Sequence, residues 1–168
     1  MTFTTNPIRS ALIESGTGRT LMEGPLGAIL LAGADDTGGT ASFVVHPMAP
    51  RTLGSPVHTH THEDEWTYVH DGTDGIQVGA EVVAAGPGDL VLKPRGVAHA
   101  FWNPADEPAR LLEVITPGGF ETYFEGLGRI LAESEPDLSA LGELAVRHAV
   151  TLDTTSVPLL MREHGLRG

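Results

Sequence analysis

The sequence predicts a mainly β protein, folded as an antiparallel sandwich or barrel, that ends in a helical segment. Short apolar runs bounded by glycine, proline and aspartate recur about every 8–12 residues in the first two thirds of the chain, which is typical of such sheets. The 168 residues include 21 glycines and 12 prolines, as many tight turns require. After residue 117 the apolar spacing changes to that of amphipathic helices.

Several apolar runs are the expected strands. The Trp-Thr-Tyr-Val run at 66–69 is aromatic and β-branched, as strands prefer. The runs at 76–78 and 81–83 flank Gly79 and Ala80, which favours a tight hairpin. The expected strands are residues 28–31, 42–45, 66–69, 76–78, 81–83, 90–92, 98–102 and 110–115.

Helices are expected in the last 50 residues. Apolar side chains from Phe120 to Leu131 follow the i, i+3, i+4, i+7 spacing of one helix face. Asp137 can cap a second helix, and a third short helix is expected near the end of the chain. We therefore divide the chain into a β domain with an N-terminal arm, residues 1–118, and a helical extension, residues 119–168. The extension would pack on the β domain or on a partner subunit.

The composition excludes several classes of function. Without cysteine, the chain forms no disulfides, thiolate metal sites or iron–sulfur clusters. It has 22 acidic and 10 basic residues, a formal net charge of −12 and no basic stripe, so we expect no nucleic-acid partner. No apolar run approaches the roughly 20 residues of a membrane span, and the start lacks a signal-peptide pattern. We therefore expect a cytoplasmic protein without a membrane partner.

Histidine is concentrated in one short stretch. Of eight histidines, four fall within thirteen residues, namely His58, His60, His62 and His70. Side chains at i and i+2 of a strand point to the same face, so a strand would present His58 and His60 together. A turn after them would bring Glu65 back to the same centre. Imidazole and carboxylate suit divalent Fe, Mn, Co, Ni, Cu or Zn, so the stretch predicts a metal site that still needs a fourth ligand.

The fourth ligand is expected in a second stretch, residues 88–103. A strand, a turn at Pro94 and Gly96, and another strand would direct His99 toward the interior. Phe101 and Asn103 share the parity of His99 and should line or brace the same interior.

The two stretches resemble the paired motifs of the cupin superfamily. The first motif has its fixed positions at Gly54, His58, His60, Glu65 and Gly72. The second has them at Gly88, Pro94, Gly96, His99 and Asn103. The resemblance covers roughly residues 40–117. It implies an antiparallel cupin-type β-barrel, a jelly roll or double-stranded β-helix, with the C-terminal α-helical part as an appendage.

The resemblance also implies one divalent metal ion inside the barrel. Its ligands would be His58, His60, Glu65 and His99. The first motif departs from the family pattern at Gly54, which lies closer to His58 than the pattern has it. Counting the family spacing from Gly54 would select the pair His60 and His62 instead. The spacing to the following glutamate and glycine favours His58 and His60, with His62 and His70 facing solvent.

Residues 56–72 and 117–121 look like those of small monocupins related to quercetin dioxygenases. That resemblance implies a metal-dependent dioxygenase that acts on a small aromatic or enolic compound through a metal-bound enolate and O2. Glu65 would serve as both ligand and catalytic base. Two alternatives stay open: a metal Lewis-acid isomerase, cyclase or lyase that needs no O2, and a non-catalytic protein that binds a small molecule.

The walls of the substrate pocket are expected to be largely apolar. The candidates are Phe101, Val69, Leu92 and Ile115. Glu113 lies in an apolar run, where it is a functional candidate if it faces inward and an ordinary surface residue if it faces outward. His46 precedes Pro47 and is expected at a strand end. We expect a homodimer, because edge strands and an amphipathic extension invite pairing.

Overall fold

The computed structural model describes residues 12–135 and 137–167, so residues 1–11 of the expected N-terminal arm lie outside the described part. The described strands form two sheets with the orders β1-β2-β3-β10-β5-β8 and β11-β4-β9-β6-β7. The strands are β1 (Arg19–Met22), β2 (Ala28–Ala32), β3 (Ser42–Met48), β4 (Val57–His60), β5 (Asp64–Asp71), β6 (Asp74–Val78), β7 (Glu81–Ala85), β8 (Leu90–Lys93), β9 (His99–Trp102), β10 (Ala109–Thr116) and β11 (Val150–Asp153). The helices are α1 (Ala34–Thr37), α2 (Glu121–Leu131), α3 (Leu138–Arg147) and α4 (Ser156–His164).

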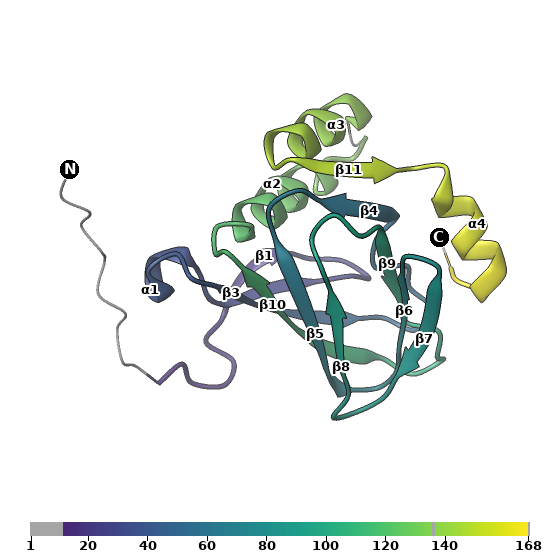
Figure 1. Cartoon of the computed structure of the whole chain (residues 1–168), viewed down its shortest axis with the longest axis horizontal. Coiled ribbons are helices and arrows are strands. Elements are labelled where there is room, and N and C mark those ends of the chain that lie inside the picture. The colour runs from purple at the N-terminus through teal and green to yellow at the C-terminus, as the bar shows by residue number, and fades with distance from the viewer. Residues whose placement is uncertain (1–11, 136, 168) are drawn as a thin grey trace.

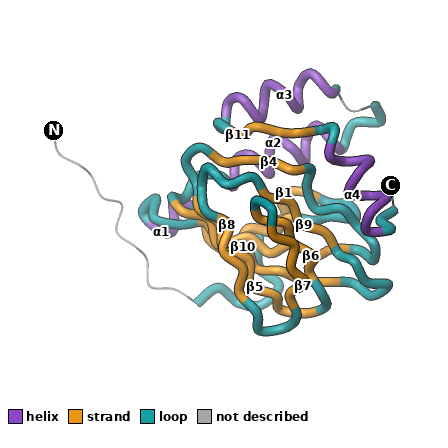
Figure 2. Tube along the Cα trace, turned by 45° about the vertical axis from the view of Figure 1, so that its right-hand side comes forward, coloured by secondary structure: helices purple, strands orange, loops and turns teal. Residues whose placement is uncertain are grey.

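The two sheets curve around a common interior, as Figures 1 and 2 show. The pairings between the described strands are antiparallel. This arrangement confirms the predicted mainly β, jelly-roll fold with helices in the C-terminal part. None of the described helices combines the length and the apolar character needed to cross a membrane.

The alternation of side chains along β10 decides what fills the interior. Ala109, Leu111, Glu113 and Ile115 are buried, whereas the residues between them are more exposed. This is the period of two that a strand imposes, and it places Glu113 inside the barrel. At the turn after β5, Gly72 has φ +80, and a Cβ there would lie 2.6 Å from the Pro108 carbonyl oxygen. Only glycine adopts this conformation without strain.

The C-terminal extension is not entirely helical. The helices are present, and Asp137 caps α3 by accepting a hydrogen bond from the Ser139 amide at 2.8 Å. Between α3 and α4, however, β11 joins the smaller sheet and pairs with β4. The sequence expectation missed this strand, because four residues between two helices carry too little periodicity to be recognised. In Figure 1 the helices α2 and α3 lie with β11 at one end of the sheets.

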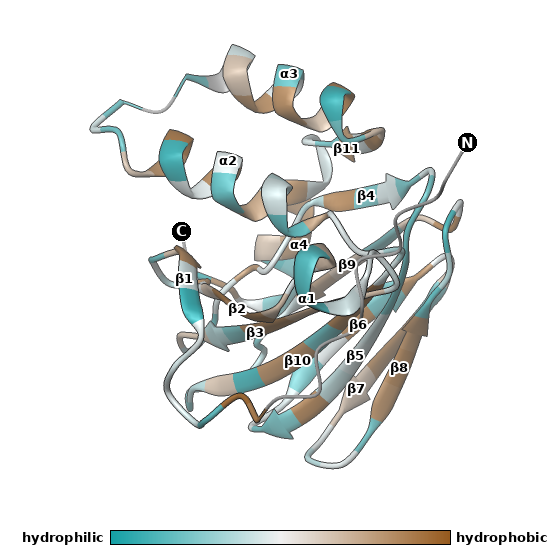
Figure 3. Ribbon diagram, turned by 90° about the vertical axis from the view of Figure 1, so that its left-hand side faces the viewer, coloured by the Kyte–Doolittle hydropathy of each residue, from teal (hydrophilic) through white to brown (hydrophobic). Residues whose placement is uncertain are grey.

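The outer faces of β7 and β8 carry apolar side chains. Val82 and Leu90 are exposed, and Figure 3 shows hydrophobic stretches along both strands. Leu92 is 54% exposed on the same outer side, which makes the expectation that it lines the pocket wrong. In β8 the fully buried residue is Lys93, which pairs with Glu65 of β5. The choice of the inner face of so short a strand depends on this cross-strand register, and the sequence of β8 does not contain it.

Candidate metal centre

Four potential metal ligands meet inside the barrel. His58 and His60 come from β4, Glu65 from β5 and His99 from β9, and one potential ligand atom of each lies within 4.8 Å of the others. His58 is paired with His99 across the sheet, with ring centroids 4.2 Å apart. His62 is exposed and does not belong to this group. The geometry therefore favours the pair His58 and His60, as the spacing to Glu65 predicts.

Backbone carbonyls orient two of the imidazoles. His58 Nδ1 lies 3.0 Å from the Pro56 carbonyl oxygen, and His99 Nδ1 lies 2.9 Å from that of Val97. Because a carbonyl only accepts, each Nδ1 carries the proton and leaves the Nε2 lone pair free for a metal ion. Burial lowers the pKa of His58 to about 3, so this ring is neutral at neutral pH.

The contacts of Glu65 indicate that a cation fits between these side chains. His99 Nε2 lies 3.1 Å from Glu65 Oε2, and His60 Nε2 lies 3.3 Å from Oε1. With the proton of His99 on Nδ1, its Nε2 faces the carboxylate as a second acceptor. Both ring nitrogens of His60 are buried without a hydrogen-bond partner among the described residues. Burial lowers the pKa of His60 to about 4, so this ring is also neutral. Lone pairs facing a carboxylate satisfy the requirements of a divalent metal site.

A buried lysine connects the ligand group to a second carboxylate. Lys93 Nζ lies 2.9 Å from Glu65 Oε2 and 2.9 Å from Glu113 Oε2. The hydroxyl of Thr67 also donates to Glu113 Oε2, at 3.0 Å. Lys93 is 1% and Glu113 2% exposed, so these charges are paired in the interior. Of the two placements left open for Glu113, the inward one is therefore the observed one.

The charges of this cluster stabilise one another. Burial alone would raise the pKa of Glu65, but the Lys93 ammonium holds it well below its usual range. Burial raises the pKa of Glu113 above its usual range, although Lys93 opposes the shift. Burial would lower the pKa of Lys93, but the two carboxylates raise it and keep the ammonium charged. The sequence pattern does not single out Lys93 as an interior residue, because lysines on strands usually face solvent.

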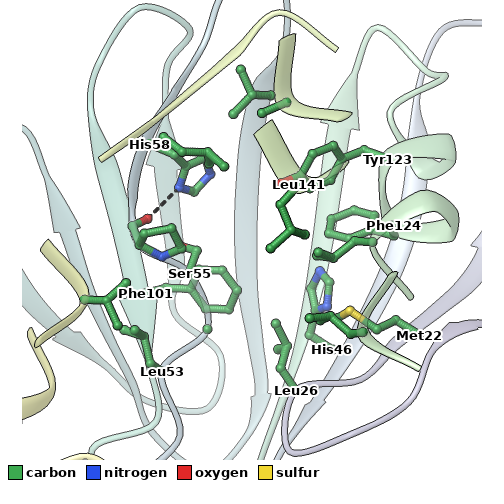
Figure 4. A pocket seen from close by; sticks show the side chains of 18 of the residues that line it. Met22, Leu26, His46, Leu53, Ser55, His58, Phe101, Tyr123, Phe124 and Leu141 are labelled. Carbon is green, nitrogen blue, oxygen red and sulfur yellow. Dashed lines mark hydrogen bonds between the residues drawn. The ribbon is translucent and has the colours of Figure 1, made fainter. Parts of the chain in front are cut away.

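A cavity of about 1200 Å³ extends from the ligand group to the C-terminal extension. Its lining includes the polar side chains of His58, Glu65, Lys93 and Glu113, and its walls are mostly apolar. In Figure 4, Phe101 and Leu53 form one side, and Phe124, Tyr123 and Leu141 form the other. Phe101 and Glu113 are thus cavity residues, as expected. Val69 and Ile115 are fully buried in the hydrophobic core instead, because their side chains pack against neighbouring core residues.

His46 is a cavity residue that the sequence expectation misplaced. It lies inside β3 rather than at a strand end, and its side chain is 1% exposed and lines the cavity. Pro47 does not end β3, which continues to Met48. The carbonyl of Pro47 accepts a hydrogen bond from the Gly27 amide at 2.9 Å, so β3 stays hydrogen-bonded to the chain before β2.

The central part of the chain is similar to a known protein family and to solved structures. No curated protein matches it. Residues 44–115 match the cupin domain family. The structure also resembles TT1209 from Thermus thermophilus, with 25% identity over 55% of this chain and 83% of that chain and a TM-score of 0.50.

Two further solved structures share the fold. KdgF from a Halomonas species is 18% identical, over 68% of this chain and 99% of that chain, with a TM-score of 0.58. A variant of oxalate decarboxylase from Bacillus subtilis is 22% identical, over 60% of this chain and 28% of that chain, with a TM-score of 0.53. Residues 44–115 thus match a cupin domain, and these solved structures share the fold of the chain.

Proposed function

We propose that this chain is a metal-dependent dioxygenase that acts on a small apolar compound of aromatic or enolic type. One observation carries the proposal: His58 and Glu65, which belong to the His58, His60, Glu65 and His99 group, line a mostly apolar cavity of about 1200 Å³. An apolar pocket with a few convergent polar groups is the usual form of a small-molecule site. The three imidazoles and one carboxylate would hold the metal ion.

A divalent ion in this group would supply Lewis acidity, which lowers the pKa of a nearby hydroxyl, and positions open to oxygen ligands. Glu65 acts as ligand and as acceptor of the proton that an enolic substrate loses. Lys93 donates to Glu65 Oε2 and so keeps the carboxylate in one orientation, with Oε1 toward His60. Glu113 in turn holds the Lys93 ammonium by accepting its hydrogen bond, and the Thr67 hydroxyl holds Glu113 by donating to it.

The apolar walls bind the body of the substrate and exclude water. Phe101 lies over the Lys93 ammonium at 5.2 Å, and Phe120 packs edge-on against His60 at 4.6 Å. These rings remove the polar groups from bulk solvent, which strengthens every charge interaction among them. Because the pKa of Glu65 is held low, its proton-accepting role requires a substrate hydroxyl whose acidity the metal has raised.

The first test is metal content. Elemental analysis of the purified chain should find one divalent ion per chain in the wild type, and loss of the ion in His60→Ala. His62→Ala is the matched control, because His62 is exposed and lies outside the ligand group. Equal metal content in His60→Ala and the wild type would contradict the site.

The second test is oxygen uptake. Protein loaded with Fe, Mn, Co or Ni should consume O2 with some member of a panel that includes 3-hydroxyflavone, a catechol and an aromatic 1,3-diketone. His99→Ala should abolish the uptake. Turnover that continues without O2 would replace the dioxygenase by an isomerase, cyclase or lyase that uses the same site.

A further inference from the structure

His46 is a second buried imidazole at the cavity, outside the metal ligand group. It projects from β3 of the larger sheet, whereas His58 projects from β4 of the smaller sheet. In Figure 4, His46 lies on the side of Met22 and Phe124, and His58 lies on the side of Ser55. The ring of His46 is held between Phe124 and Phe101, with centroid distances of 5.1 and 6.0 Å. The two imidazoles therefore reach the cavity from facing sheets.

The tautomer of His46 is fixed by the backbone. Its Nδ1 lies 2.8 Å from the Gly27 carbonyl oxygen, which only accepts, so Nδ1 carries the proton. Burial lowers the pKa of His46 to about 4, so the ring is neutral and Nε2 is unprotonated. No residue in the described ranges 12–135 and 137–167 makes a hydrogen bond to Nε2. With Nδ1 turned to Gly27, the Nε2 edge is the polar part of the ring left for the cavity that His46 lines.

We infer that His46 is a ligand-binding residue whose Nε2 accepts a hydrogen bond from a hydroxyl of the bound molecule. Nε2 is not among the fully buried side-chain atoms that lack a partner, so it is accessible from the cavity, where a ligand hydroxyl can donate to it. A carboxylate cannot fill this place, because it has no proton to donate.

The ligand class follows from the two polar places. The molecule has an apolar body, one oxygen at the His58, His60, Glu65 and His99 group, and a hydroxyl directed to His46. The first contact rests on the proposed metal-dependent function, whereas the second rests on His46 alone. A methyl ether in place of the hydroxyl keeps the shape but loses the donor, so it should bind more weakly.

The inference can be tested with three flat probes of graded hydroxylation. These are 2,6-dihydroxynaphthalene, 6-methoxy-2-naphthol and 2,6-dimethoxynaphthalene, titrated calorimetrically against the full chain loaded with Zn²⁺, which has no redox chemistry. The wild type should bind the dihydroxy probe about tenfold more tightly than the monomethyl ether, the effect of one net hydrogen bond. His46→Leu should bind these two probes equally.

Two more variants control for folding and position. His46→Gln keeps an acceptor at similar reach and should retain the preference for the dihydroxy probe. His62→Leu changes an exposed histidine and should leave all affinities unchanged. Retention of the preference in His46→Leu, equal affinity of the wild type for the two probes, or no binding of either would overturn the inference.

His99→Ala separates this inference from the proposed function. It removes a ligand of the metal group and leaves His46 as the one place for a hydroxyl, so the dihydroxy probe and the monomethyl ether should bind this variant equally. If His99→Ala binds like the wild type while His46→Leu loses the preference, the metal-dependent function fails and the role of His46 stands. If only His99→Ala loses the preference, the role of His46 fails and the metal-dependent function stands.

Discussion

The buried His46 should make the protein sensitive to acid by an amount that can be calculated. Burial lowers its pKa from 6.5 to about 4, so the unfolded chain binds a proton at higher pH than the folded chain. Stability is therefore complete above the unfolded pKa and is lost as the pH falls toward the folded pKa. Integrating the difference from about pH 8 to about pH 4.5 gives a loss of about 2.5 kcal/mol from this one group.

The assay is urea unfolding of the wild type and His46→Gln at several pH values in that window. Gln can keep the hydrogen bond to the Gly27 carbonyl but does not titrate, so its stability should fall by about 2.5 kcal/mol less than that of the wild type. His58 and His60 also have lowered pKa values, and they contribute equally to the curves of both proteins. Both proteins are treated with the same chelator, so that a bound metal does not change the titration of these two histidines. Parallel curves for the two proteins would refute the reasoning.

Three further predictions follow from particular contacts. Lys93→Met should lower the unfolding free energy by about 3–5 kcal/mol, because two buried carboxylates lose their shared cation, and adding Glu113→Gln should recover part of the loss in urea titrations. Gly54→Ala should destabilise by about 1–3 kcal/mol in thermal unfolding, since the new methyl group would collide with the Phe101 ring. Light scattering should give the mass of a homodimer, with Leu90 and Leu92 on an exposed edge strand as the apolar surface to cover, and Leu92→Lys should weaken a dimer formed there.

The ligand group could be predicted because its information is local. His58 and His60 are two residues apart on one strand, and Glu65 follows after one turn, so strand geometry alone brings them together. His99 needed the second motif, whose Pro94 and Gly96 mark the turn before the strand. In each case a short range of sequence determines which way the side chain faces.

The residues that were missed depend on contacts across the sheets. Lys93 faces inward because β8 pairs with β5 in a register that sets Lys93 opposite Glu65. The pairing with β5 thus determines which face of β8 points inward, and the assignment of Leu92 to the pocket was wrong for this reason. His46 looked like a strand end because Pro47 usually marks one, yet β3 runs on between two partner strands.

The extension is part of the site rather than an attachment to a finished barrel. Its strand β11 pairs with β4, so that Val150 lies opposite His60 and Leu152 opposite His58. Phe120, just before α2, packs against the His60 ring, and it shares a hydrophobic cluster with barrel residues such as Val44. The strand that carries His58 and His60 is therefore held by β9 on one side and by the extension on the other. Because Tyr123, Phe124 and Leu141 also form cavity wall, the extension determines which molecules fit beside the metal ligands.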